Sequence, residues 1–161
     1  MKYGARWYNL IGSPRFDVPW KVTAIQVVFD EPVTTGNVQS LTGITATKLT
    51  GLGTTTLTWK VPTILKGSFA TVLVATGPNA LKDVGGNLIA PFSRAVNVLY
   101  GDFNDDQVVN GLDEAGVRAN VVAPYQTGPA GYNQFADLSG DGLVNLIDVG
   151  VARGRKGKTL P

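Results

Sequence analysis

Two short segments of the chain carry oxygen-bearing side chains at matching positions. The first, DFNDDQVVNGLD, spans residues 102–113, and the second, DLSGDGLVNLID, spans residues 137–148. Counted from its first Asp, each segment has Asp, Asn or Ser at positions 1, 3, 5, 9 and 12. Together they hold seven of the twelve acidic residues and no Lys or Arg. Carboxylates gathered this closely repel one another unless a cation lies between them.

This spacing is that of a twelve-residue calcium loop, in which position 7 supplies a backbone carbonyl and position 12 a carboxylate from the first turn of a helix. Ca²⁺ takes about six to eight oxygen ligands, and short side chains at positions 1, 3 and 5 can surround it while the chain turns. The spacing therefore predicts two calcium ions. The ligands predicted for the first ion are Asp102, Asn104, Asp106, Val108, Asn110 and Asp113. Those predicted for the second are Asp137, Ser139, Asp141, Leu143, Asn145 and Asp148.

The alternative is a pair of Asx-turns and helix N-caps, because Asp and Asn also favour those positions. The repeat favours calcium, since apolar and basic residues recur at the same offset of 35 as the acids: Val109 matches Val144, and Arg118 matches Arg153. Internal repetition predicts one small unit used twice and packed face to face. We expect Val109 and Val144, at position 8, to pair in a short β-contact between the loops.

Position 6 distinguishes the two loops. It is usually Gly because the turn there is sharp, and it is Gly142 in the second loop but Gln107 in the first. A left-handed Gln costs about 1 kcal/mol. We therefore predict that the first loop binds calcium more weakly, unless Asp105 offsets this cost electrostatically. Position 12 is Asp rather than Glu in both loops, so each helix must begin closer to the ion.

The pattern of residues 1–99 is typical of a β domain. Apolar and polar residues alternate at 25–29 and 57–61, β-branched runs occupy 69–76 and 95–100, and weaker candidates lie at 6–11 and 44–49. Pro32 and Pro62 are expected to end their strands. Six or seven short strands separated by turn residues predict an antiparallel β-sandwich, although a small barrel would leave a similar pattern.

The pattern changes after Gly101, where each acidic loop leads into a short helical segment. Leu112, Ala115, Gly116, Ala119 and Val122 are expected on one helical face, as are Leu146, Val149, Gly150 and Arg153. Residues 121–135, with two Pro and two Gly, indicate a connecting loop. We expect two domains, a β-sandwich over 1–99 and a calcium module over 100–161.

Composition excludes several classes of function. The chain has no Cys and no His, so disulfides, thiolate chemistry and a Ser-His-Asp triad are excluded, and structural zinc is disfavoured. The acids outside the loops, Asp17, Asp30, Glu31, Asp83 and Glu114, form no convincing pair for glycoside hydrolysis. Basic residues are scattered, which favours a solvated surface over nucleic-acid binding. No apolar run is long enough to span a membrane and no signal peptide is visible.

The repeated motif D-x-[NS]-x-D-x-x-V-N-x-x-D, each copy followed by a helix, resembles a type I dockerin over about residues 100–157. The resemblance implies a calcium-folded module of EF-hand-like repeats that binds a cohesin in a cellulosome. It also implies partner-reading positions in each repeat, which are Gly111, Leu112, Arg118, Ala119 and Ala123, then Leu146, Ile147, Arg153, Gly154 and Lys158. We expect Gly111, Leu112, Arg118, Leu146, Ile147 and Arg153 to form the partner surface.

The segment before it resembles a bacterial Ig-like domain through VVFDEPV, TLTWKVP and KDVGGNLIAP. The two resemblances imply a non-catalytic anchoring module of a secreted or cell-surface protein that docks to a cohesin-like partner. A calcium-stabilised spacer without a cohesin is one alternative. A carbohydrate-binding sandwich is another, with Trp7 and Trp20 as open candidates and Trp59 read as core. The chain itself is expected not to be an enzyme, while a parent glycoside hydrolase stays open.

Overall fold

The computed structural model describes residues 1–4, 6–121 and 132–161. The chain forms two compact units. The first contains residues 23–63 and 69–96 together with Met1, and the second contains residues 2–22, 64–68 and 97–161. The expected boundary between residues 99 and 100 falls inside the second unit, which also takes in the N-terminal segment.

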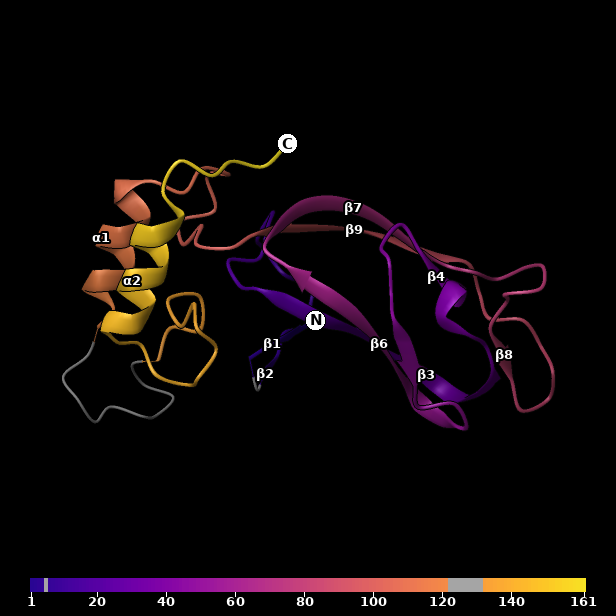
Figure 1. Cartoon of the computed structure of the whole chain (residues 1–161). Helices are drawn as coiled ribbons and strands as arrows, with labels where there is room; N and C mark the ends of the chain where they lie inside the picture. Colours follow the sequence, from indigo (N-terminus) through magenta and orange to yellow (C-terminus); the bar gives the residue numbers. More distant parts are fainter. Residues whose placement is uncertain (5, 122–131) are drawn as a thin grey trace. The chain divides into compact units, whose positions relative to one another are not determined.

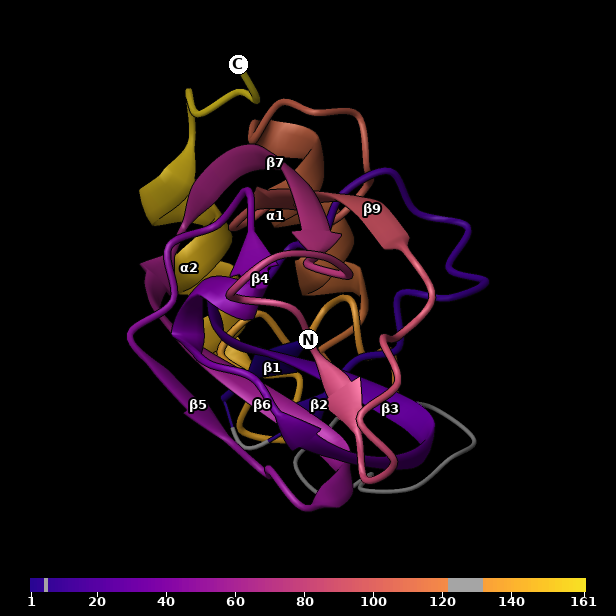
Figure 2. The ribbon, with the colours of Figure 1, turned by 90° about the vertical axis from the view of Figure 1, so that its right-hand side faces the viewer.

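The first unit is built from two sheets (Figures 1 and 2). In one sheet β6 lies between β3 and β5, and β8 pairs with β3; in the other β7 lies between β4 and β9. The strands are β3 (Val22–Thr35), β4 (Leu41–Thr42), β5 (Lys48–Thr50), β6 (Thr54–Ile64), β7 (Lys66–Leu73), β8 (Lys82–Asp83) and β9 (Phe92–Leu99), and a 3-10 helix, η1, spans Val38–Ser40. The predicted β-rich, sandwich-like character of this region is confirmed.

Alternation along β6 explains how the core of this unit forms. Leu57, Trp59 and Val61 point inward and are buried, while Lys60 between them is exposed. Successive side chains of a strand face opposite sides, so one face of β6 is buried and the other faces solvent. Trp59 is completely buried, which confirms its prediction as a core residue.

The strands run further than the prolines predicted. β3 continues through Pro32 to Thr35, and β6 continues through Pro62 to Ile64. Proline lacks an N–H group, but its φ is compatible with extended backbone wherever the ladder needs no donor from that residue. Val33 and Thr35, just beyond Pro32, pair with β8 across a register shift. The expectation that these prolines end their strands is wrong.

The second unit contains a short hairpin and two helices. β1 (Lys2–Tyr3) pairs with β2 (Arg6–Trp7), and α1 (Gly111–Ala119) packs beside α2 (Leu146–Arg155), as Figure 1 shows. The core between the helices consists of Val117, Leu138, Val149 and Ala152. No helix in the described part of the chain is long and apolar enough to cross a membrane.

The expected apolar face of the first helix is wrong. Leu112, Ala115 and Ala119 are exposed, and the side chains that α1 buries are Asp113 and Val117. The helix is nine residues long and packs through Val117, while Gly116 leaves room for the Phe103 ring. Val122, the last residue of the expected face, lies outside the described residues, as do residues 122–131 of the expected connecting loop.

An aromatic cluster joins the N-terminal segment to the start of the second repeat. Trp20 stacks on Tyr3 with ring centroids 4.0 Å apart and on Phe135 at 5.5 Å. Its indole N–H donates to the carbonyl of Gln134 at 3.1 Å. Trp20 is completely buried, so the expectation that it is open to a sugar is wrong. Trp7 is 43% exposed.

Candidate calcium loops and docking surface

The first acidic segment is folded around the carboxylate of Asp102. Its Oδ1 accepts from the backbone N–H of Asp105 at 2.7 Å, and its Oδ2 accepts from that of Gln107 at 2.6 Å. Asn104 and Asp106, at positions 3 and 5, are joined by a 2.9 Å hydrogen bond between their side chains. Loop positions 1, 3 and 5 therefore lie around one tight turn, as the calcium spacing requires.

Asp113 closes this loop at position 12. Its Oδ1 accepts from the backbone of Phe103 at 2.8 Å, which brings the start of α1 back to the start of the loop. Its Oδ2 accepts from the backbone of Asn110 at 2.7 Å, and the Asn110 side chain accepts from the backbone of Leu112 at 2.7 Å. This reciprocal pair is a capping box, which satisfies N–H groups that a helix start leaves without partners.

The second segment repeats these contacts. The carboxylate of Asp137 accepts from the backbone N–H groups of Gly140 and Gly142, both at 2.8 Å. Asp148 accepts from the backbone of Ser139 and of Asn145, also at 2.8 Å. The N-cap geometry raised as the alternative is therefore present in both copies. It is compatible with a calcium loop, because position 12 of such a loop lies in the first turn of the helix.

Four loop carboxylates are completely buried: Asp102, Asp113, Asp137 and Asp148. Burial raises the pKa of Asp102 and of Asp148, because desolvation penalises the charged form. Among the described ion pairs, Asp137 has only Arg6 at 3.9 Å, and no Lys or Arg pairs with the other three. Buried carboxylates without a cationic partner are costly, and a bound cation would remove that cost.

The donor set fits a hard cation, since it consists of carboxylate, amide, hydroxyl and carbonyl oxygens. Within the described residues, no group of three or more acidic side chains is arranged so that it could already hold a metal ion. The reason is visible in the first loop. Asp102 and Asp113 turn their oxygens to backbone amides, while Asp106 lies at the exposed side.

Backbone strain is concentrated in the first loop. Gln107 has φ +69°, and Asp105 has φ +67°. Position 6 of the second loop, Gly142, has φ +97°. The prediction that Gln107 adopts a left-handed conformation is confirmed. Two non-glycine residues at positive φ each cost about 1 kcal/mol, so the first loop carries strain that glycine avoids in the second.

Val109 pairs with the C-terminal segment instead of with the other loop. Its N–H donates to the carbonyl of Lys158 at 2.8 Å, and its carbonyl accepts from Gly157 at 2.8 Å. Val108 forms a β-bridge with Thr159 next to it. The expected β-contact between Val109 and Val144 is wrong, because both backbone groups of Val109 already have these partners.

The predicted partner residues lie on the exposed side of the helices. Leu112 is 66% exposed, Leu146 69% and Ile147 61%, so a large apolar side chain follows the cap of each helix in contact with water. Gly111, Ala119 and Gly154 are exposed as well, and so is Lys158. Ala123 lies outside the described residues.

Arg118 and Arg153 converge on one acid that the sequence did not single out as functional. Arg118 donates to Oε1 of Glu114 at 3.1 Å from the same helix, and Arg153 donates to that atom from α2 at 2.6 Å. Lys156 lies 2.6 Å from Oε2. These contacts hold the pKa of Glu114 at about 2, and the hydrogen bond from Arg153 has the largest effect. The spacing of Glu114 and Arg118, four residues apart on a helix, was the available signal.

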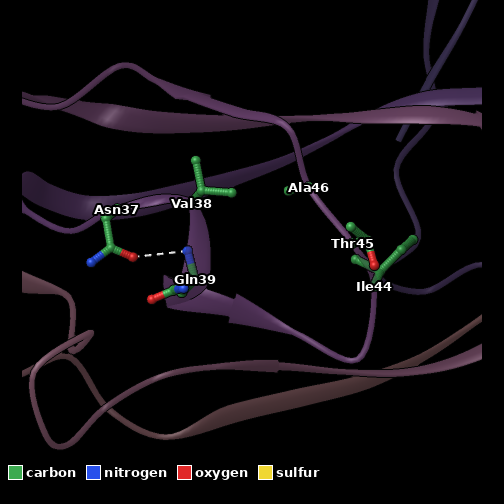
Figure 3. A pocket seen from close by; sticks show the side chains of 6 residues that line it. All are labelled: Asn37, Val38, Gln39, Ile44, Thr45 and Ala46. Carbon is green, nitrogen blue, oxygen red and sulfur yellow. Dashed lines mark hydrogen bonds between the residues drawn. The ribbon is translucent and has the colours of Figure 1, made fainter.

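The first unit has a hollow beside η1, shown in Figure 3. Its lining residues are Asn37, Val38, Gln39, Ile44, Thr45 and Ala46. Asn37 accepts a hydrogen bond from the backbone of Gln39 at 2.8 Å and so caps η1 (Figure 3). None of the six residues is titratable, so the lining of the hollow supplies no acid or base.

Residues 100–151 match the family model described as the dockerin type I domain. The match spans less than half of the chain, and it includes all twelve predicted loop ligands. The resemblance to a type I dockerin is therefore confirmed for this segment. No curated protein matches the chain significantly.

One solved structure that matches is an N-terminal interface mutant of a type II cohesin–X–dockerin complex from Acetivibrio cellulolyticus. The identity is 14%, and the alignment covers 86% of this chain and 97% of the other. The TM-score is 0.33.

Proposed function

We propose that the dockerin type I segment, residues 100–151, is a calcium-dependent docking module that binds a cohesin-like protein. Each loop would hold one Ca²⁺ through the six positions predicted from its spacing. The first unit, together with this module, would act as a non-catalytic anchoring part of a secreted or cell-surface protein. A polysaccharide-degrading parent is part of this proposal.

The calcium part rests on the buried loop carboxylates. Asp102 and Asp113 in the first loop are completely buried and accept hydrogen bonds from backbone N–H groups, and Asp148 does the same in the second. Backbone amides supply partial positive charge, whereas a divalent cation supplies a full counter-charge within the same turn. Bound Ca²⁺ would stabilise the ionised carboxylates, with Asn104, Asp106 and the carbonyl of Val108 available as further ligands.

The docking part rests on the exposed apolar side chains after the two caps. Leu112 and Ile147 occupy the same position in the two repeats, and both are more than half exposed. Their backbone N–H groups are held by Asn110 and Asn145, both at 2.7 Å. The loops would therefore fix the places where these side chains meet a partner, which makes docking depend on calcium.

A capture experiment tests the docking proposal. Immobilised cohesin modules, of type I and of type II, are incubated with the full chain in calcium or in excess chelator. We expect retention in calcium and none in chelator. Leu112→Ser and Ile147→Ser should each weaken retention by about tenfold, since central apolar contacts dominate interface energies. Val28→Ser, which changes a 70% exposed residue of β3, is the matched control and should bind normally.

Two results of that experiment would count against docking. If the chain folds with calcium but no cohesin retains it, the module is a calcium-stabilised spacer. If retention survives both serine substitutions, the apolar positions after the caps are not the interface. Sugar binding is a separate question, and Trp20 and Trp59 do not support it because both are completely buried.

A further inference from the structure

The N-terminal segment holds the first loop through the side chain of Asp105. Oδ2 of Asp105 accepts from the backbone N–H of Phe16 at 2.9 Å, and Oδ1 accepts from that of Asp17 at 2.9 Å. Two successive backbone amides pointing at one carboxylate form an anion-binding concavity. Asp105 is position 4 of the loop, so it supplies no predicted calcium ligand.

Arg15 strengthens the same contact. Its guanidinium donates to the carbonyl of Asp102 at 2.8 Å and to that of Phe103 at 2.8 Å. Its side chain is only 10% exposed, and Nη2 lies 3.7 Å from Oδ1 of Asp105. The guanidinium also lies 4.7 Å from the centroid of the Phe135 ring. The largely buried guanidinium of Arg15 thus holds the backbone at positions 1 and 2 of the first loop.

The same segment also reaches the second loop. Gly4 approaches Gly140, the residue at position 4, so closely that a Cβ on Gly4 would lie in contact with the Gly140 carbonyl. Arg6 lies over the Tyr132 ring at 4.6 Å and 3.9 Å from the carboxylate of Asp137. Gly4 and Arg6 on one side and residues 15–17 on the other therefore contact equivalent positions of the two loops.

Position 4 has a left-handed backbone in both loops, with φ +67° at Asp105 and +76° at Gly140. Glycine adopts this conformation without strain in the second loop, whereas the first loop must be held there by other contacts. The carboxylate of Asp105 provides such contacts because it fixes the strained residue to the amides of Phe16 and Asp17.

We infer that residues 2–4 and 6–17 are a positioning element of the calcium module, with Asp105 and Arg15 holding the first loop in its ion-binding conformation. The inference rests on the proposed function, because it requires that the loops bind calcium. Thermodynamic linkage is reciprocal. If the N-terminal segment favours the ion-binding conformation of the loop, a bound ion must in turn stabilise the contacts between that segment and the loop.

Calcium titration calorimetry of the full chain tests this inference. Asn has the same shape as Asp and also tolerates a left-handed backbone. Asp105→Asn therefore removes only the negative charge that accepts hydrogen bonds from the amides of Phe16 and Asp17. We expect one of the two calcium affinities to fall by about tenfold, as losing a charged hydrogen bond implies, while the other is unchanged. Asp30→Asn, the same chemical change at an exposed position of β3, should leave both affinities unchanged. Arg15→Lys should also lower the calcium affinity of the first loop and leave that of the second loop unchanged.

Amide hydrogen exchange supplies an independent readout. In the unaltered chain, calcium should slow exchange at Phe16 and Asp17, and Asp105→Asn should remove that response. If both calcium affinities persist in Asp105→Asn and calcium does not change exchange at these amides, the inference is overturned while the proposed calcium binding stands. If the unaltered chain takes up no calcium, the proposed function fails and the inference with it.

Discussion

Arg153 on α2 donates two hydrogen bonds to Oε1 of Glu114 on α1, at 3.0 and 2.6 Å. Arg118 shares the same acceptor, so both arginines of the repeat are drawn to one acid between the helices. The side chains of Arg118 and Arg153 remain 52% and 62% exposed. A partner carboxylate can therefore reach the two guanidinium groups without unfolding the helix pair.

The first prediction concerns these arginines. We expect Arg118→Glu with Arg153→Glu to weaken docking at least tenfold, because rim charges reversed against a complementary partner become repulsive. The two new carboxylates would face Glu114, so the melting temperature should fall modestly while the helix pair stays folded. Surface plasmon resonance and thermal melts measure the two effects. Lys60→Glu on β6 is the control for charge alone, and unchanged affinity in the double variant would place the interface elsewhere.

The second prediction concerns Gln107. Its described backbone bonds, from its N–H to Asp102 and from Leu160 to its carbonyl, do not need its side chain. Gln107→Gly should therefore stabilise the second unit by up to about 1 kcal/mol by relieving a left-handed side chain. Calcium affinity of the first loop should rise with it.

Urea unfolding and calcium titration of Gln107→Gly provide the measurement. Gly142→Ala is the matched reverse change, because Gly142 occupies the same position at φ +97°. It should lower stability and weaken the second site. A loss of stability in Gln107→Gly would show that the Gln side chain contributes more than its backbone conformation costs.

The third prediction compares two glycines of the N-terminal segment. Gly4 and Gly12 both have positive φ, but a Cβ at Gly12 meets nothing within 4 Å, whereas one at Gly4 meets the backbone of Gly140. Gly12→Ala should cost about 1 kcal/mol from strain alone. Gly4→Ala should cost about 1–3 kcal/mol more, because backbone cannot yield as a side chain can. Equal losses in chemical denaturation would mean that the contact with Gly140 is unimportant.

The fourth prediction is a pH dependence in the first unit. The Asn87 side chain and backbone donate to the carboxylate of Asp83, both at 2.8 Å, and these bonds lower the pKa of Asp83. A folded pKa below the unfolded value means that the folded state releases its proton more readily. The stabilisation is therefore present at neutral pH, above the unfolded pKa, and is lost as the pH falls through the lowered folded value.

Thermal melts between pH 2.5 and pH 7, taken about every half pH unit, test the predicted direction of this stability change. The difference in stability between the unaltered chain and Asp83→Asn should be largest at neutral pH and shrink under acid. Glu31→Gln on β3 is the control for loss of an acid from the same unit. A difference that grows as the pH falls would contradict the direction of the Asp83 pKa.

Local patterns allowed much of the chain's structure to be predicted from sequence. Alternation placed Trp59 in the core, the repeat placed both loops, and the missing glycine placed Gln107 at positive φ. These features depend on residues close together in the chain. The position of Trp20 could not be predicted in this way, because it is set by Tyr3 and Phe135, which lie far apart in sequence.

The role of the N-terminal segment was hidden for the same reason. Arg15 and Asp105 are separated by ninety positions, and nothing in the spacing of either predicts their contact. The buried face of α1 was misassigned because Leu112 and Ala119 follow helical periodicity yet point to water, where a partner would cover them. Exposed apolar residues on a docking surface obey the same periodicity as a core.

We propose above all that the paired loops bind calcium and thereby fix the second unit. Isothermal calorimetry of the full chain, combined with limited proteolysis with and without chelator, tests it most directly. We predict uptake of two Ca²⁺ per chain and protection of residues 100–157 from cleavage only when calcium is present. No heat of binding, together with the same cleavage pattern in calcium and in chelator, would contradict it.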